Sequence, residues 1–491
     1  MRSLFFALLV SVTAARADEN PSESEMFGNE PEKEKPAQVP ETQAPRDDAI
    51  LGATSPAQQN SSETAAEDPL KIGGQFYLRS FMATREKQPP SAWTLSLPSL
   101  VDGYFDARPN ERVRGFLLAR MKFDPSIDPN APNLFSQLAG ATNGSGTGAA
   151  TATVAAKPDP GPSVSLDQLW MSFDTNHQIF WTVGRQHVKW AAGRFWTPTD
   201  FLHPVRKDPL AIFDLRTGTT MVRANVPLED LSMNVSAVAL LEGFSPANSI
   251  GQVGGAARAE IVLGPTEFAL DAIAVRGRKP RLGADFSFGL GDFDFYGEVG
   301  VRQANEVTLY RKRANPISAL GLFGQFESYV PTGTAVQATG GASYAVNYND
   351  NDVLNFGAEY FWNDQLGYDD ASIYPWLFLQ NAFTPFYLGK QYGALFVSLP
   401  KPGDWDNTSF TLSTLGNLSD RSFITRLDYS LVFLTNMTLE IFGDVHYGEA
   451  GGEFRLGVNV PPQPLSNGTY SSAVVIAPPL YDAGIALRVK I

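Results

Sequence analysis

Residues 282–302 read LGADFSFGLGDFDFYGEVGVR, and this stretch decides the fold of the chain. Apolar and polar side chains alternate on both sides of the Gly-Asp pair at 291–292. Every odd-numbered position from 293 to 301 is apolar or glycine. The even-numbered positions from 294 to 302 include the charged residues Glu298 and Arg302. Alternation with period two is typical of a β-strand with one apolar and one wetted face. The Gly-Asp pair is typical of a tight hairpin turn, so the stretch predicts two paired antiparallel strands.

The same alternation returns at residues 354–363, 423–431, 437–447 and 481–491. A soluble β-sandwich would give this local signal too, but three features favour a membrane barrel. The segments have about the 9–11 residues that a tilted strand needs to cross the hydrocarbon layer. Aromatic residues gather near segment ends, as interfacial girdles require, and tight turns alternate with long polar loops.

Tight turns are predicted near residues 108–110, 175–177, 227–230, 264–266, 291–292, 349–352, 402–406 and 435–436. Pairing each turn with its flanking segments gives about 18 strands, and about 16 is the open alternative, because strand boundaries read from a pattern are uncertain by several residues. The predicted fold class is therefore an all-β, transmembrane antiparallel barrel. A barrel of this size can hold an aqueous lumen.

The N-terminal region divides into two parts that precede the barrel. Residues 1–17 combine Arg2, a short apolar run and an Ala-Arg-Ala site, which indicates a cleaved secretory signal. Residues 18–69 hold 13 acidic and 3 basic side chains and one aromatic residue. Such a composition predicts a disordered periplasmic segment, either a passive leader or an arm for a periplasmic partner. The barrel is assigned to residues 70–491.

Composition restricts the function further. The 491-residue chain has no cysteine and a formal net charge of −14, which gives no basic face for nucleic acid. The four histidines, His177, His187, His203 and His446, are not accompanied by a serine-nucleophile motif or by metal-ligand spacing. We therefore expect neither an enzyme nor a bound metal or cofactor.

The long loop at residues 191–218 holds the main candidates for a pore constriction. If this loop folds into the lumen, its basic side chains favour anions, and its tryptophans form a surface for apolar groups or sugars. Alternatively, the loop packs on the outer rim with its charges solvated. The candidates, including two residues of the preceding segment, are Arg185, Trp190, Arg194, Trp196, Asp200, His203, Arg206, Lys207, Asp208 and Arg216.

Charged residues on the polar faces of the predicted strands are expected to face the lumen. Their mixed signs would orient polar solutes, although a water-filled wall needs such residues in any case. These residues are Glu298, Arg302, Arg426, Asp428, Glu440 and Asp444. A separate basic cluster at residues 311–313 lies in another predicted external loop, where it either attracts anions or is simply solvated.

A short stretch also resembles known proteins. The segment GRQHVKW at 184–190 and the later Asp200 and Pro204 are similar to a GRQ-x-x-x-W-G strand and D-x-x-N-P loop of uncharacterised Gram-negative outer-membrane barrels. More distantly, the stretch resembles the alginate-export and other substrate-specific porin families. Ala191 and His203 depart from the pattern, where Gly and Asn are usual. The resemblance covers about 40 residues and implies a porin-like barrel without indicating a cargo.

These observations predict an outer-membrane pore for passive diffusion of small hydrophilic or anionic solutes. Two alternatives stay open. One is a substrate-specific channel for a hydrophobic or polymeric cargo that works with a periplasmic partner through residues 18–69. The other is a plugged structural or adhesive barrel. The expected partners are outer-membrane lipid, small solutes and the outer-membrane assembly machinery, and both chain ends are expected in the periplasm.

Overall fold

The computed structural model describes residues 69–127, 161–203, 205–241, 253–276, 278–317, 324–349, 352–380, 382–462 and 473–491. The signal predicted at 1–17 and nearly all of the acidic segment predicted at 18–69 lie outside these residues. Within the described part of the chain, no helix combines the length and apolarity that a membrane crossing requires.

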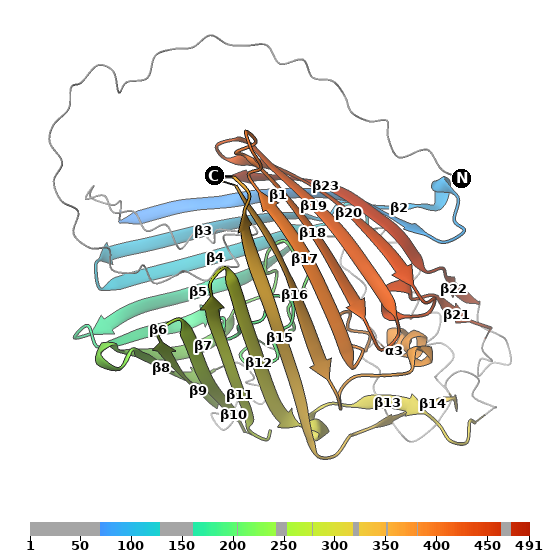
Figure 1. The fold of residues 1–491 in the computed structure, drawn as a ribbon, viewed down its shortest axis with the longest axis horizontal. Helices are drawn as coiled ribbons and strands as arrows, with labels where there is room; N and C mark the ends of the chain where they lie inside the picture. The colour runs from blue at the N-terminus through green and yellow to red at the C-terminus, as the bar shows by residue number, and fades with distance from the viewer. Residues whose placement is uncertain are drawn as a thin grey trace, which may run out of the picture. The chain divides into compact units, whose positions relative to one another are not determined.

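The described residues form one large antiparallel sheet that closes on itself as a barrel of 18 strands (Figure 1). Each strand pairs with the next, and the last strand pairs with the first over the register from Gln75↔Lys490 to Arg85↔Pro479. The strands of the wall are β1 (Leu70–Arg85), β3 (Ser99–Asn110), β4 (Val113–Phe123), β5 (Ser163–Thr175), β6 (Ile179–Gln186), β7 (Thr219–Leu228), β8 (Met233–Leu240), β9 (Gly254–Leu263), β10 (Thr266–Val275), β11 (Arg281–Leu290), β12 (Phe293–Gln303), β15 (Thr334–Asn347), β16 (Val353–Asn363), β17 (Gln391–Pro400), β18 (Thr408–Asn417), β19 (Ser422–Leu434), β20 (Met437–Gly448) and β23 (Pro479–Lys490).

The two ends of the barrel differ in their connections. At one end, called the turn end here, eight short connections join consecutive strands, and each lies within a few residues of a predicted tight turn. The start of β1 and the end of β23 also lie at the turn end, where Gly74 and Ile491 exchange backbone hydrogen bonds of 2.9 and 3.0 Å. The opposite end, called the loop end, carries the long connections.

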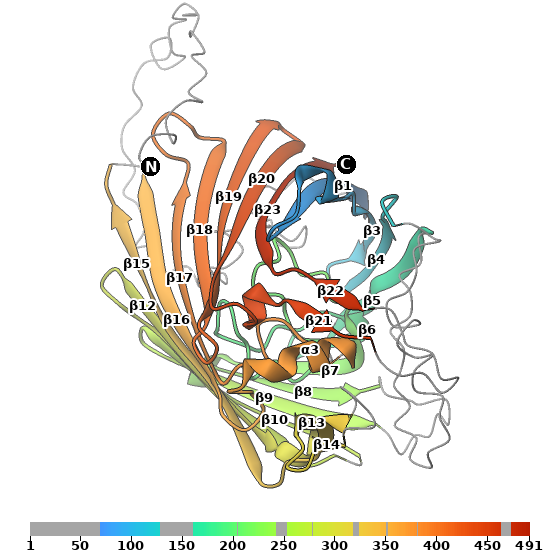
Figure 2. The same ribbon diagram turned by 90° about the vertical axis from the view of Figure 1, so that its right-hand side faces the viewer.

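Short elements that the alternation does not predict lie mainly in the loop-end connections. Figure 2 shows α3, β21 and β22 in front of the barrel opening. The elements are β2 (Thr94–Ser96), β13 (Leu309–Lys312), β14 (Phe326–Tyr329), β21 (Val458–Val460), β22 (Val474–Ile476), α3 (Tyr374–Leu379), and the 3-10 turns η2 (Pro90–Ala92), η5 (Ala304–Glu306), η7 (Ala371–Ile373) and η8 (Glu453–Arg455), with η3 (Glu229–Leu231) at the turn end.

The two faces of the wall show the reverse of the usual burial pattern. Large apolar side chains on the outer face are exposed, as for Leu270 at 66% and Leu395 at 61%. Charged side chains on the inner face, among them Arg258, Glu298 and Glu359, are buried. This is the arrangement of a barrel with an apolar surround and a polar interior. Period-two alternation produces it, because successive residues of a strand point to opposite faces.

Candidate functional site

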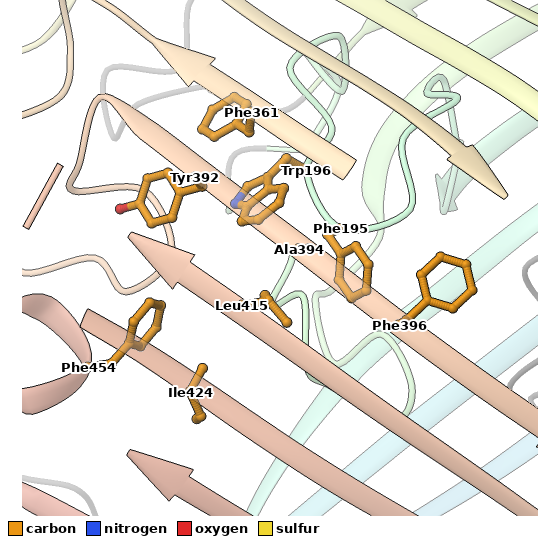
Figure 3. Close-up of a cluster of buried hydrophobic side chains, with 9 residues drawn as sticks. All are labelled: Phe195, Trp196, Phe361, Tyr392, Ala394, Phe396, Leu415, Ile424 and Phe454. Atoms are coloured by element: carbon orange, nitrogen blue, oxygen red, sulfur yellow. The ribbon is translucent and has the colours of Figure 1, made fainter. Parts of the chain in front are cut away.

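The connection between β6 and β7, residues 187–218, folds into the barrel and is called the inward loop. Trp196 is fully buried, its ring stacks on Phe361 of β16 at a centroid distance of 5.6 Å, and it also contacts Tyr392 of β17 (Figure 3). The indole nitrogen of Trp196 donates a hydrogen bond of 2.9 Å to the backbone oxygen of Phe386. Of the two placements that the sequence allows, the outer-rim one is therefore excluded.

The same loop contacts two further stretches of the wall. Trp190 is 4% exposed and packs in a cluster with Met221 of β7 and Val238 of β8. Phe213 contacts the ring of Tyr77 on β1 edge-on, at a centroid distance of 5.1 Å. The inward loop thus crosses the interior of the barrel. Because Trp190 and Trp196 are covered by protein, they anchor the loop rather than present a surface to solutes.

Two buried wall carboxylates hold residues 193–199, which are called the tip of the inward loop. The Glu359 carboxylate accepts hydrogen bonds from three consecutive backbone amides, those of Arg194 at 2.8 Å, Phe195 at 3.1 Å and Trp196 at 2.8 Å. The Tyr296 hydroxyl donates to the same carboxylate at 2.7 Å. Successive amides that converge on one anion form a nest, and hydrogen bonds to a charged acceptor are among the stronger ones. Glu359 therefore fixes the position of the loop.

Glu298 on β12 provides the second attachment of the tip. Its carboxylate accepts a hydrogen bond from the Gly193 amide at 3.2 Å and another from the Thr199 hydroxyl. Glu298 is 2% exposed, and Glu359 is 3% exposed. Both acids are satisfied by neutral hydrogen-bond donors, those of the loop and, for Glu359, also the Tyr296 hydroxyl, rather than by cations.

The base of the inward loop is tied to the wall by a chain of charged and imidazole groups. β5 bulges at Asp167, which has no partner in the register with β4 and turns its side chain inward. Its carboxylate contacts His187 Nε2 at 3.0 Å and the Arg120 guanidinium at 3.4 Å. The His187 ring stacks on that of His203 at a centroid distance of 5.5 Å.

The chain of contacts continues within the inward loop. The Asp200 carboxylate contacts His203 Nδ1 at 2.8 Å and Arg216 Nη1 at 2.7 Å. Burial alone would lower the pKa of Arg216, but the carboxylates of Asp214 and Asp200 outweigh burial and raise it. Arg216 is therefore a structural cation whose charge is neutralised by two acids.

The other basic candidates of the inward loop do not form one ring. The Arg194 guanidinium lies 3.8 Å from the centroid of the Phe396 ring, and Lys207 Nζ donates to the Arg194 backbone oxygen at 2.8 Å. The Arg206 guanidinium lies 4.5 Å from the centroid of the Tyr387 ring. Burial lowers the pKa of Arg206. Arg194 and Lys207 line a recess on the turn-end side of the loop, together with residues of β18, β19 and β20.

Two remaining candidates lie apart from this interior. Arg185, at the end of β6, donates to Thr220 Oγ1 at 3.4 Å and to the Leu166 backbone oxygen at 3.1 Å, so it bonds to the neighbouring strands. Asp208 is exposed, and its side chain accepts a hydrogen bond from the Leu210 amide at 3.0 Å.

Five of the six expected lumen residues make inward contacts, whereas the sixth, Arg302, makes neither a hydrogen bond nor an ion pair within the described residues. Arg426 Nε donates to Asp428 at 2.8 Å, and its Nη1 lies 3.7 Å from Asp444. Glu440 pairs with Arg488. These residues form a mixed-charge wall over β19, β20 and β23, and Asp428 and Glu440 line the same recess as Arg194 of the inward loop.

Three wall arginines have neither a hydrogen bond nor an ion pair within the described residues: Arg79 of β1, Arg223 of β7 and Arg302 of β12. In each, only Nε is among the buried nitrogens without a partner, so the terminal nitrogens reach solvent. The inward carboxylate of Asp271 also lacks a partner there, but both of its oxygens are covered. Only Arg302 was expected from the sequence.

Several positioning residues were missed by sequence reasoning, above all Glu359 and Asp167. Glu359 stands on a polar strand face, but nothing local indicates its contacts with the loop. Asp167 carries a readable signal, because the exposed Leu166 and Leu169 flank it at a spacing of three rather than two. No group of three or more His, Cys, Asp or Glu side chains in the described ranges is arranged to hold a metal ion.

Similarity to known proteins is found at the level of solved structures. No protein-family model matches the sequence, and no curated protein matches it. The structure of Acinetobacter baumannii OccAB1 is 12% identical, with a TM-score of 0.47 over 88% of this chain and 99% of that one. Acinetobacter baumannii OccAB3 is 9% identical, with a TM-score of 0.45 over 86% and 99%. A triple mutant of the Rhodopseudomonas blastica porin is 8% identical, with a TM-score of 0.39 over 86% and 100%.

Proposed function

We propose that this chain is an outer-membrane pore through which small hydrophilic solutes diffuse, with a preference for anions. The exposed apolar outer face supports a bilayer as the surround of the barrel, because apolar surface of this extent is unfavourable in water. The polar inner face and the inward loop support a lumen of restricted width. On this reading, the turn end, with the start of β1 and the end of β23, faces the periplasm.

One observation carries the proposed anion preference. Arg79, Arg223 and Arg302 present terminal guanidinium nitrogens to solvent, and none of them forms an ion pair with a carboxylate among the described residues. In contrast, the tip-holding acids Glu298 and Glu359 are occupied by loop donors. Unpaired cations on a low-dielectric wall attract anions and repel cations, which is how charged side chains set selectivity in pores.

The test is single-channel recording of the refolded chain in a planar bilayer under a salt gradient. A reversal potential on the anion side is expected, and the triple variant Arg79→Gln, Arg223→Gln, Arg302→Gln is expected to shift it toward zero. Arg421→Gln is the matched control, because Arg421 is an exposed loop-end residue paired with Glu449. Conductance with cation preference would contradict the proposed selectivity. A folded barrel without conductance would instead favour a plugged barrel.

A further inference from the structure

A recess lies at the loop end of the barrel. It lies between the β13–β14 hairpin and the connection from β16 to β17. Asp364, which follows the last residue of β16, and Lys390, which precedes the first residue of β17, both line it. The recess therefore stands directly on the rim of the barrel.

Aromatic side chains form the lining of this loop-end recess. Tyr310, Tyr329 and Tyr368 all line it. The Tyr368 hydroxyl accepts a hydrogen bond of 3.2 Å from the Tyr310 amide, which holds the two segments together. Behind the lining, the Trp376 ring of α3 contacts the ring of Tyr310 at 6.4 Å and stacks on Phe326 at 5.3 Å. The Tyr310 ring is thus supported by a packed layer, and the Arg311 guanidinium lies 5.0 Å from the centroid of the Tyr329 ring.

The polar lining combines unused hydrogen-bonding groups with paired charges. Within the described residues, the Asp364 carboxylate, the Gln365 amide and the hydroxyls of Tyr310 and Tyr329 make no hydrogen bond. The cations do have partners: Arg311 contacts Glu327 at 2.8 Å, Lys312 contacts Asp370 at 2.9 Å, and Lys390 contacts Asp369 at 2.5 Å. The three cations that line the recess are therefore each paired with an acid and do not favour an anion at this place.

We propose that the loop-end recess binds the neutral sugar units of a free saccharide. Sugar rings present C–H groups that pack on aromatic faces, and their hydroxyls both donate and accept hydrogen bonds. Tyr310 and Tyr329 supply the faces, while Asp364 and Gln365 supply acceptors and donors. Each charged group that is already paired gives a neutral ligand an advantage over an ionic one. The proposal does not depend on conduction through the barrel.

Isothermal titration of the folded full chain with maltotriose, cellotriose and xylotriose tests the recess. Binding of at least one of these is expected, and Tyr329→Ala and Asp364→Ala should each weaken it at least about tenfold, which corresponds to loss of one hydrogen bond or ring contact. Tyr329→Phe keeps the ring and should retain most of the affinity. Ser328→Ala, on the same strand but outside the recess, is the matched control.

Three results would overturn the proposal. They are absence of binding by all three trisaccharides, binding that persists unchanged in both alanine variants, and tighter binding of the acidic trigalacturonate. Displacement of the bound trisaccharide by lipopolysaccharide would identify membrane-held sugars, not a free saccharide, as the ligand source and would overturn that part. Wild-type single-channel conductance and heat-modifiable gel mobility in the variants separate loss of binding from misfolding. Conductance without saccharide binding would overturn the saccharide site and leave the proposed pore standing. Saccharide binding without conductance would overturn the pore and leave the saccharide site standing.

Discussion

The backbone amide of Trp196 donates a hydrogen bond of 2.8 Å to the carboxylate of Glu359, although the two residues are 163 positions apart in the sequence. The contact joins a loop that leaves the wall after β6 to the inner face of β16. The position of the inward loop therefore depends on a wall residue that is distant in sequence. We expect the loop to loosen when either partner is substituted.

Substitution Glu359→Gln should loosen the tip of the inward loop. Glutamine has a single acceptor oxygen, and its amide group would face the amides that the carboxylate now accepts, at a cost of about 1–3 kcal/mol for the donors left unsatisfied. Hydrogen exchange of residues 193–199 should accelerate, and single-channel current should become noisier. Glu229→Gln, in the turn-end η3, is the control. Unchanged hydrogen exchange at the tip would show that Glu359 does not hold it in place.

Substitution Trp196→Ala should remove the packing of the tip against β16 and β17. Truncation of a buried aromatic side chain costs about 3–5 kcal/mol in protein cores. We expect a changed mean conductance, because the tip would no longer be held against the wall, and a lower temperature for the loss of heat-modifiable mobility. Trp405→Ala is the matched control, since Trp405 is 60% exposed. Equal conductance in the two variants would show that Trp196 does not hold the constriction.

Substitution Gly184→Ala should impair folding of the wall beside the inward loop. Gly184 has a φ of 125°, and a Cβ there would lie 2.1 Å from the Leu169 backbone oxygen. A non-glycine residue in such a conformation costs about 1–3 kcal/mol even before the clash. The refolding yield should fall, as judged by heat-modifiable mobility. Gly115→Ala is the control, because a Cβ at Gly115 meets no atom within 4 Å; similar yields for both variants would refute this reasoning.

Stability of the loop-end segment around η8 should fall as pH rises. Burial raises the pKa of the Glu453 carboxyl from its ordinary value of 4.5 to about 8, and the Asp420 carboxylate adds to the effect. Hydrogen bonds from Tyr392 at 2.5 Å and Asn417 at 2.8 Å oppose it. Between these pH values the folded state binds a proton that the unfolded state releases. The stabilisation is thus complete below about pH 4.5 and is lost toward pH 8.

Hydrogen exchange of residues 449–460, corrected for the intrinsic pH effect, measures this dependence. Protection should decrease from pH 5 to pH 8.5 in the wild type, and Glu453→Gln should flatten the profile. Glu449→Gln is the control, because Glu449 is exposed and pairs with Arg421. A profile that stays equally steep in Glu453→Gln would assign the dependence to another group.

Period-two alternation predicts most of the wall, because it depends on residues two apart in one strand. Gly291 and the other turn residues likewise act locally, so the turn-end connections are predicted within a few residues. The site is different. The contacts of Glu359 with the inward loop join residues more than 160 positions apart, and no local pattern reports them. The bulge at Asp167 can be read from the spacing of Leu166 and Leu169, but its contact with His187 cannot. Arg79 and Arg223 stand on inward faces, but their lack of an ion-pair partner depends on which neighbours the closed barrel provides.

The pairing of β1 with β23 has a consequence for the order of folding. These two strands are the most distant in sequence, yet they are neighbours in the wall. A single pairing of very high contact order therefore closes the barrel. The hairpins β3–β4 to β19–β20 can form from near neighbours, whereas this seam requires nearly the whole chain. Until it forms, two strand edges stay open and can pair wrongly with another molecule. Aggregation is therefore the greatest risk before β1 and β23 have paired.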